Sequence, residues 1–219
     1  MAFTATYDAC VLHPAGLRDL LVRLGMTGLF RAVWSDQTLD EMVGSIIRRH
    51  SDLTVEKLAR TRELMCKAVP DCLVTGYESL IDGLELPDPD DRHVLAAAIR
   101  SGSQVIVTEN LSDFPTEVLE PYGIEAQSPD IFLLHLIDLS ATAVAAVIER
   151  QAADLTNPPM SVTEVLQHLA SSGLPRSVAA LRLLQPARAK PRSRRRDPLH
   201  PAVVDRFEPP ETICAVTSV

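Results

Sequence analysis

The chain has 219 residues, a formal net charge of −8, and a composition that is 46% hydrophobic. This length fits one domain with an appendage, and the aliphatic content is sufficient for a buried core. No apolar run approaches the roughly 20 residues that span a membrane, and the first residues lack the basic and apolar segments of a signal peptide. The cysteines include no Cys-x-x-Cys pair, which argues against a zinc site or a disulfide framework. We therefore expect a cytoplasmic protein with reduced thiols.

Short apolar runs alternate with helical patterns along the first 138 residues. The stretch Pro14–Gly25 carries leucines at helical spacing, and Ser35 or Asp36 can cap the helix expected at Gln37–Arg49. This alternation predicts a parallel, doubly wound α/β sheet. The expected strands are Phe3–Tyr7, Leu29–Trp34, Cys72–Thr75, Gln104–Thr108 and Gly123–Ala126, and further helices are expected at Thr54–Ala68, Arg92–Arg100 and Glu117–Pro121.

Beyond residue 138 the pattern contains helices alone. Three amphipathic segments have apolar faces that must pack on the preceding domain or on a dimer partner. Proline-rich residues 186–219 show little periodicity and are expected to be disordered. We therefore divide the chain into an α/β domain at 1–138, a small all-helical extension at 139–185 and a tail at 186–219. The helical segments are Thr142–Leu155, Val162–Ser171 and Pro175–Leu184.

Charge is distributed unevenly along the chain. Six positive charges lie between Arg188 and Arg196, where there is no acid, so the rest of the chain is more acidic than its net charge indicates. Nucleic-acid enzymes usually draw much of their affinity from basic residues that contact phosphates. An acidic body therefore predicts local contact with nucleic acid, or a basic partner that covers it. The basic stretch is either a non-specific phosphate clamp or a solvated segment without a role.

Four acidic residues recur where expected strands end or helices begin: Asp8, Glu41, Asp91 and Asp113. In an open α/β sheet, ligands bind at the carboxyl ends of strands and the adjoining helix starts. Carboxylates that converge there repel one another unless a cation holds them together, and Mg²⁺ or Mn²⁺ prefers such oxygen ligands. The pattern favours a metal-dependent phosphodiesterase site.

Each of these residues also has an ordinary structural explanation. Asp91 could compensate the dipole at a helix start, with Asp90 nearer the cap. Asp8 could form a turn, although a carboxylate directly after a buried strand costs free energy unless it is paired or metal-bound. Glu41 could be a solvated helix residue, and its neighbour Asp40 is a competing candidate.

The loop after the strand Gln104–Thr108 offers a similar choice. Asp113 and Asn110 belong to residue types that commonly form turns. Thr108 ends the strand, and its hydroxyl is suited to orienting a carboxylate or a water molecule. His93 lies close to Asp91, in the helix expected at Arg92–Arg100, and is expected to point away from the site.

The order Asp, Glu, Asp, Asp resembles the acidic quartet of PIN-domain ribonucleases, and in particular the VapC-type toxins of bacterial toxin–antitoxin pairs. Residues 88–99 (DPDDRHVLAAAI) and 105–115 (VIVTENLSDFP) are similar to the third and fourth acidic motifs of that fold. The resemblance covers roughly residues 3–138. It favours Glu41 over Asp40 and makes Asp113 the fourth carboxylate. Asn110 departs from the fully acidic variants of the family.

The resemblance implies a PIN-like, Rossmann-like parallel sheet flanked by helices and a Mg²⁺- or Mn²⁺-dependent endoribonuclease. Asp8 and Asp91 would be metal ligands, and Glu41 and Asp113 would complete the site or orient a water molecule. RNA would be the substrate, a cognate antitoxin would inhibit the enzyme, and the chain would form a homodimer. The expected supporting residues are Thr108, Asn110 and Asp90.

Two other functions remain open. One is a metal-dependent phosphatase that acts on small phosphoesters, and the other is a catalytically silent PIN-like module that binds RNA or protein. Retention of all four carboxylates argues against the silent module. A haloacid-dehalogenase phosphatase would need a second Asp two residues after Asp8, where Cys10 stands. The sequence has no Gly-x-x-x-x-Gly-Lys-Ser/Thr loop and no Gly-x-Gly-x-x-Gly turn.

Overall fold

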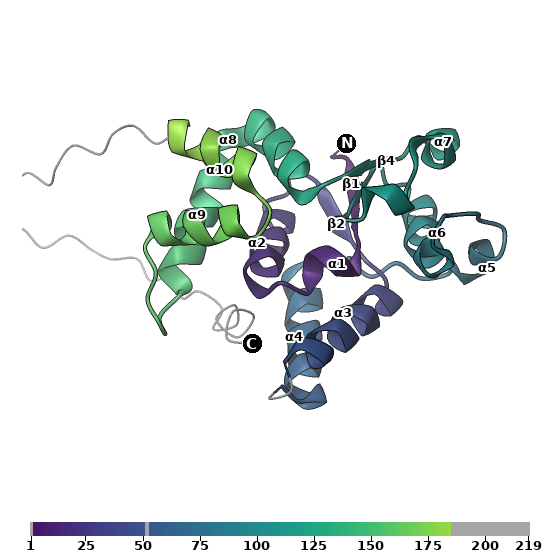
Figure 1. The fold of residues 1–219 in the computed structure, drawn as a ribbon, viewed down its shortest axis with the longest axis horizontal. Helices are drawn as coiled ribbons and strands as arrows, with labels where there is room; N and C mark the ends of the chain where they lie inside the picture. Colours follow the sequence, from purple (N-terminus) through teal and green to yellow (C-terminus); the bar gives the residue numbers. More distant parts are fainter. Residues whose placement is uncertain (1, 51–52, 185–219) are drawn as a thin grey trace, which may run out of the picture.

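A four-stranded parallel sheet in the order β2-β1-β3-β4 lies at the centre of the fold in a computed structural model (Figure 1). The structure describes residues 2–50 and 53–184. The tail expected at 186–219 and its basic stretch therefore lie outside the described residues. The strands are β1 (Thr4–Tyr7), β2 (Arg31–Val33), β3 (Val105–Val107) and β4 (Glu125–Gln127).

Helices connect the strands and confirm the expected α/β class. Ser35 and Thr54 each accept a hydrogen bond at the start of a helix, from Thr38 N and Lys57 N respectively, as N-cap residues do. The helices of the α/β region are α1 (Ala9–Leu12), α2 (Ala15–Gly25), α3 (Asp36–Arg49), α4 (Val55–Ala68), α5 (Glu78–Ile81), α6 (Arg92–Ser101) and α7 (Thr116–Leu119), with 3-10 turns η1 (Pro89–Asp91), η2 (Leu111–Asp113) and η3 (Glu120–Tyr122).

Successive residues of each strand serve opposite faces of the sheet. Tyr7 and Trp34 stack with their ring centroids 5.9 Å apart in the larger buried cluster, which includes residues of α2, α3 and α4. Val33 and Ile106 point to the other face, where they pack with α6. Both faces are covered, as expected for a parallel sheet, so the carboxyl ends of the strands form the accessible edge.

Two expected strands differ from the structure for local backbone reasons. Cys72–Thr75 forms only an isolated parallel bridge between Leu73 and Trp34, because Asp71 and Gly76, with φ of 57° and 71°, bound the segment on both sides. The last strand was expected to begin at Gly123. It begins two residues later, because Gly123 adopts φ of 67° and closes the preceding 3-10 turn.

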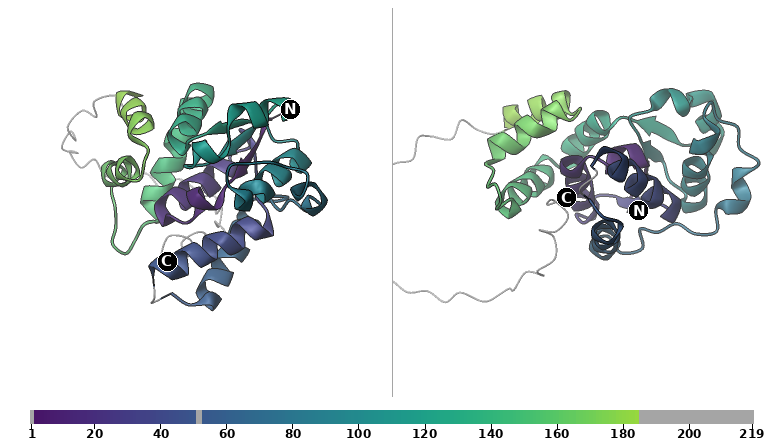
Figure 2. Two further views of the ribbon diagram at one scale, coloured as in Figure 1. Left: turned by 45° about the vertical axis from the view of Figure 1, so that its right-hand side comes forward. Right: turned by 60° about the horizontal axis from the view of Figure 1, so that its bottom comes forward.

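The C-terminal helices pack beside the sheet domain (Figure 2). They are α8 (Pro129–Asp154), α9 (Val162–Ser171) and α10 (Pro175–Leu184). α8 comprises two helical segments, of which the second corresponds to the helix expected at Thr142–Leu155. By length and composition α8 is apolar enough to cross a membrane. It bends at Ser140, which has non-helical φ and ψ, and buries Val144 and Ile148 in the same cluster as the sheet. The expected domain boundary at 138/139 lies next to this bend and stays a prediction.

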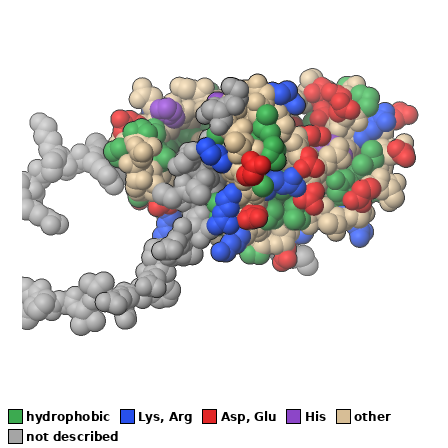
Figure 3. All heavy atoms as spheres, turned by 90° about the horizontal axis from the view of Figure 1, so that it is seen from below, with side chains coloured by type: hydrophobic (Ala, Val, Ile, Leu, Met, Phe, Trp, Pro, Cys, Tyr) green, Lys and Arg blue, Asp and Glu red, His purple; other side chains and the backbone are tan. Residues whose placement is uncertain are grey.

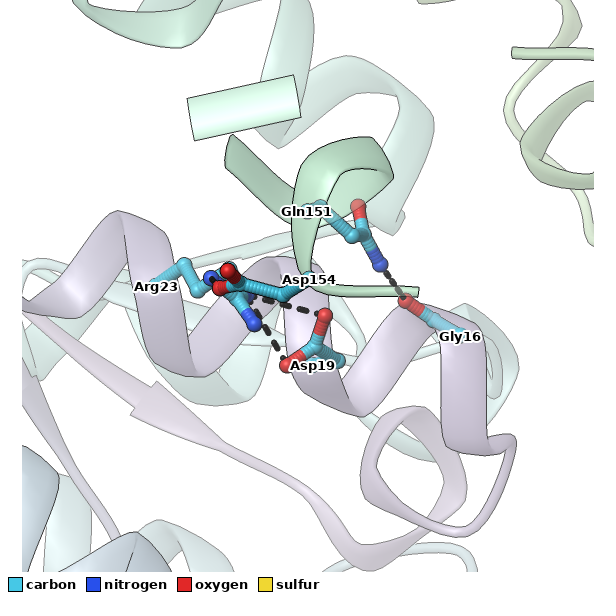
Figure 4. A network of polar contacts seen from close by, with 5 residues as sticks. All are labelled: Gly16, Asp19, Arg23, Gln151 and Asp154. Atoms are coloured by element: carbon cyan, nitrogen blue, oxygen red, sulfur yellow. Dashed lines mark hydrogen bonds and ion pairs between the residues drawn. The ribbon is translucent and has the colours of Figure 1, made fainter. Parts of the chain in front are cut away.

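A buried polar network joins α8 to α2 (Figure 4). Arg23 donates from Nε to both carboxylate oxygens of Asp19, at 3.0 and 2.9 Å, and from Nη1 to Asp154 at 2.7 Å. Gln151 donates to the carbonyl oxygen of Gly16 at 3.0 Å. Because buried polar groups are costly unless they are hydrogen-bonded, these contacts fix how the extension sits on the α/β domain.

Candidate active site

Asp8 lies directly after the central strand β1, and it is buried with 3% of its surface exposed. The hydroxyl of Thr108, which follows β3, donates to Asp8 Oδ2 at 2.7 Å. The thiol of Cys10 donates to the same oxygen at 2.9 Å. The carboxylate is therefore held in one orientation by groups from two neighbouring strand ends, while Asp8 also lines an open hollow.

Asp91 closes the turn η1 and immediately precedes α6. Burial raises its pKa to about 7, and four neighbouring carboxylates add to the rise: Asp8, Asp88, Asp113 and Glu41. Like charges have this effect only when they are close together. The structure thus brings the other three acids that the sequence singled out close enough to Asp91 to affect its pKa.

Asp88 and Asp90 have different roles at the turn η1 from those expected. Asp88, rather than Asp90, is the N-cap residue, because its Oδ1 accepts a hydrogen bond from Asp90 N at 2.9 Å. Asp90 is exposed, and it lines the same hollow as Asp91. Asp90 is therefore available to a ligand rather than committed to capping the turn.

Glu41 and Asp40 face different neighbours. Asp40 forms an ion pair with Arg62 of α4, which also pairs with Asp36 at 3.0 Å. Glu41 lines the hollow, and its Oε1 lies 2.8 Å from Nε2 of His93. The prediction that His93 points away from the site was therefore wrong: α6 turns this side chain, 1% exposed, toward α3.

The loop after β3 brings further groups to the same edge. Thr108 Oγ1 accepts from Asn110 N at 3.0 Å, so one hydroxyl links the loop backbone to Asp8. In the sequence, Cys10 was notable only because it stands where a phosphatase would need a second Asp. In the structure, its Sγ accepts a hydrogen bond from Glu109 N at 3.2 Å. Asp113 does not line the hollow and accepts from the hydroxyl of Ser112 at 3.3 Å.

The hollow above this edge has a volume of about 530 Å³. Acidic side chains occupy one end of it, and basic side chains from the last turn of α3 lie at the other end. The residues that line it are Asp8, Ala9, Cys10, His13, Gln37, Glu41, Ser45, Arg48, Arg49, Asp90, Asp91, Glu109 and Asn110.

The donor set suits a hard divalent cation, because it consists of carboxylate oxygens that repel one another. Burial is the largest cause of the raised pKa of Asp91, and the charges of the neighbouring carboxylates add to it. Within residues 2–50 and 53–184, no three His, Cys, Asp or Glu side chains are close enough together to enclose a metal ion as they stand. The carboxylates would have to move closer together to share one.

Comparison with known proteins agrees with this architecture. Residues 4–112 match the family described as PIN domain. The chain belongs to the PIN-domain family. The match contains Asp8, Glu41 and Asp91, and it ends one residue before Asp113. Residues 129–183 match the VapC50 C-terminal domain, so the helices α8 to α10 form a recognised unit of this kind of PIN-domain protein.

A curated relative is similar to about half of the chain. "Putative ribonuclease VapC50" of Mycobacterium tuberculosis is 41% identical over 112 residues, which are 51% of this chain and 65% of the relative. The match thus spans slightly less than two thirds of the relative. No solved structure matches this PIN-domain protein.

Proposed function

We propose that this PIN-domain protein is a Mg²⁺- or Mn²⁺-dependent endoribonuclease that acts as the toxin of a toxin–antitoxin pair. The observation that carries the proposal is geometric: Asp8, Glu41, Asp90 and Asp91 line one hollow at the carboxyl edge of a parallel sheet. The name of the relative supports RNA as the substrate. The protein would act in the cytoplasm, where both RNA and Mg²⁺ are available.

Asp8 and Asp91 are the residues that would hold the metal, and Glu41 and Asp113 would complete the site or orient the attacking water. When bound, the ion lowers the pKa of a water molecule and neutralises charge on the phosphodiester in the transition state. Thr108 and Cys10 hold the Asp8 carboxylate in place. Asn110 and Asp90 line the hollow beside these acids and can contact the substrate.

The test is cleavage of total RNA by the purified protein, with and without EDTA, beside a generic small phosphoester. We expect RNA cleavage that needs Mg²⁺ or Mn²⁺ and that falls at least a hundredfold in Asp8→Asn or Asp91→Asn. Asp40→Asn is the matched control, because Asp40 lies next to Glu41 but pairs with Arg62. Cleavage of the small phosphoester alone would support a phosphatase, and full RNA cleavage by both variants would exclude this metal site.

The same hollow provides a route for inhibition. A cognate antitoxin would insert an Arg or Lys among the carboxylates, where charge complementarity is large. We also propose that the active form is a homodimer. Expression of this protein alone, without an antitoxin gene encoded beside it, should be harmful. Co-expression of the two proteins should restore growth and yield a complex. Harmless expression, with no binding to the product of a neighbouring gene, would remove the toxin assignment but not the ribonuclease.

A further inference from the structure

One face of α3 connects the acidic end of the hollow to two arginines. Gln37, Glu41 and Ser45 recur every four residues, and the face continues to Arg48 and Arg49. With a rise of 1.5 Å per residue, Arg48 lies about 10 Å along the helix axis from Glu41. Both arginines are exposed. On the face of the molecule seen in Figure 3, Lys and Arg side chains gather beside acidic ones.

Arg49 is held in a defined position by His13. Its Nη1 lies 2.8 Å from Nε2 of His13. Burial and the charge of Arg49 lower the pKa of His13, which favours the neutral ring with Nε2 as acceptor. A second hollow of about 150 Å³ shares His13 and Arg49 with the first and adds His50 and Ile46. The two hollows are therefore adjacent, and His13 and Arg49 line both of them.

The arginines of α3 differ from other arginines nearby. Arg62, Arg60 and Arg23 each have a carboxylate partner, whereas among the described residues neither Arg48 nor Arg49 forms an ion pair. Arginine in the last turn of a helix stabilises the helix dipole. That role does not require a guanidinium that lines a hollow and is fixed by a histidine. Within residues 2–50 and 53–184, then, no carboxylate neutralises these two charges, and both guanidinium groups line the hollow.

We propose that Arg48 and Arg49 bind a backbone phosphate of the RNA strand beside the bond to be cut, and that His13 positions Arg49 for this contact. The inference rests on the proposed ribonuclease function and assigns the end of the hollow that holds the RNA backbone. The planar guanidinium suits the paired oxygens of a phosphate. The carboxylates repel phosphates, so the arginine end supplies the attraction that draws an RNA strand into an acidic hollow.

The test separates RNA binding from cleavage. The full-length Asp91→Asn protein is titrated with a labelled single-stranded oligoribonucleotide in EDTA at several NaCl concentrations. Adding Arg48→Gln and Arg49→Gln should weaken binding at least tenfold at low salt. The slope of log K against log salt should fall by about 0.7, the change expected when the contact with one phosphate of a single strand is lost. Lys57→Gln with Lys67→Gln, two exposed lysines of α4, is the charge-matched control and should leave the slope unchanged.

Cleavage by the otherwise wild-type enzyme gives a second readout. The arginine variant should raise KM for RNA with little change in kcat, and Arg48→Lys with Arg49→Lys should restore most of the salt dependence. His13→Ala should weaken binding less than loss of Arg49. If wild-type protein cleaves RNA but the arginine variant matches the lysine control in binding and KM, this inference fails alone. If wild-type protein neither binds nor cleaves RNA, it fails together with the proposed function.

Discussion

At the candidate site, the fold raises the pKa of Asp91 well above its ordinary value. Its pKa rises from 3.8 to about 7, so the folded protein binds this proton more tightly than the unfolded chain does. In metal-free protein, the free energy of unfolding should therefore fall as pH rises from about 4 to about 7, and then level off. A bound metal ion would neutralise the carboxylates around Asp91 and so reduce this loss of stability.

The corresponding prediction uses Asp91→Asn in EDTA. The variant should be more stable than wild type at pH 8, by about 1 kcal/mol once screening by water around a half-buried cluster is considered. It should match wild type at pH 4, because Asp91 is then protonated. Urea unfolding at the two pH values measures this, with exposed Asp138→Asn as control. An unchanged pH dependence in Asp91→Asn would contradict the repulsion argument.

His93 offers a second prediction at the scale of single residues. Its Nε2 lies 2.8 Å from Glu41 Oε1, and the side chain is buried. Residues that orient metal ligands typically change affinity or activity by 10–100-fold when they are removed. His93→Ala should lower Mn²⁺ affinity about tenfold, measured by calorimetry, and His93→Gln should recover part of it. Exposed His168→Ala is the control, and full Mn²⁺ affinity in folded His93→Ala would show that Glu41 needs no such support.

The sequence could identify the acids but not their neighbours. Asp8 stands out because a carboxylate directly after a buried strand needs a partner. The choice between Glu41 and Asp40 depended on family resemblance, and the structure explains it through the ion pair of Asp40 with Arg62. His93 and Cys10 could not be found, because their contacts join elements that are distant in sequence or depend on how a turn is oriented.

At the scale of elements, helix boundaries were predictable wherever capping residues marked them. Ser35 and Thr54 cap α3 and α4 close to the expected positions, and α10 has the bounds that were predicted. Strand ends were less accurate, because positive φ at Asp71, Gly76 and Gly123 interrupts apolar runs that read as extended. Each interruption depends on a single residue, so it leaves no periodic signal in the sequence.

The start of α10 leads to a prediction about a cap from another helix. Asp130 of α8 accepts from Ser177 N at 2.8 Å and from Arg176 N at 3.1 Å. Asp130→Ala should cost about 1–2 kcal/mol, since the buried amide of Ser177 and the part-buried amide of Arg176 both lose their acceptor. Hydrogen exchange at these two amides should accelerate, whereas Asp138→Ala should have no effect. Equal exchange and equal urea midpoints in the two variants would show that α10 does not depend on this cap.

At the scale of the whole molecule, the extension and the PIN domain share one buried cluster. Val165, Leu169 and Val178 of α9 and α10 lie in the same cluster as Tyr7 and Trp34 of the sheet edge. The apolar faces of these helices predicted that they would pack on the preceding domain or on a dimer partner. Which surface they cover depends on the network between Arg23 and Asp154, and a single sequence gives no signal for such a pairing.

The last prediction concerns this network. Arg23→Met leaves the carboxylate of Asp19, 1% exposed, buried without its main partner. Loss of one member of a buried ion pair costs about 3–5 kcal/mol. The free energy of unfolding of Arg23→Met should therefore fall by about this amount in urea titrations. Adding Asp19→Leu should recover much of the loss, because the two apolar side chains leave no uncompensated charge.

Two probes then decide whether the extension and the PIN domain unfold together. Trp34, the single tryptophan of the chain, is buried beside the sheet and reports the PIN domain, and far-ultraviolet circular dichroism reports the helices of both parts. Coincident transitions are expected in wild type and in the double variant, because one cluster and one polar network join the two parts. In Arg23→Met the helical signal should be lost at a lower urea concentration than the Trp34 signal, since α8 loses its anchor on α2. Identical midpoints for the two probes in Arg23→Met, with no loss of stability, would mean that apolar packing alone holds the extension in place.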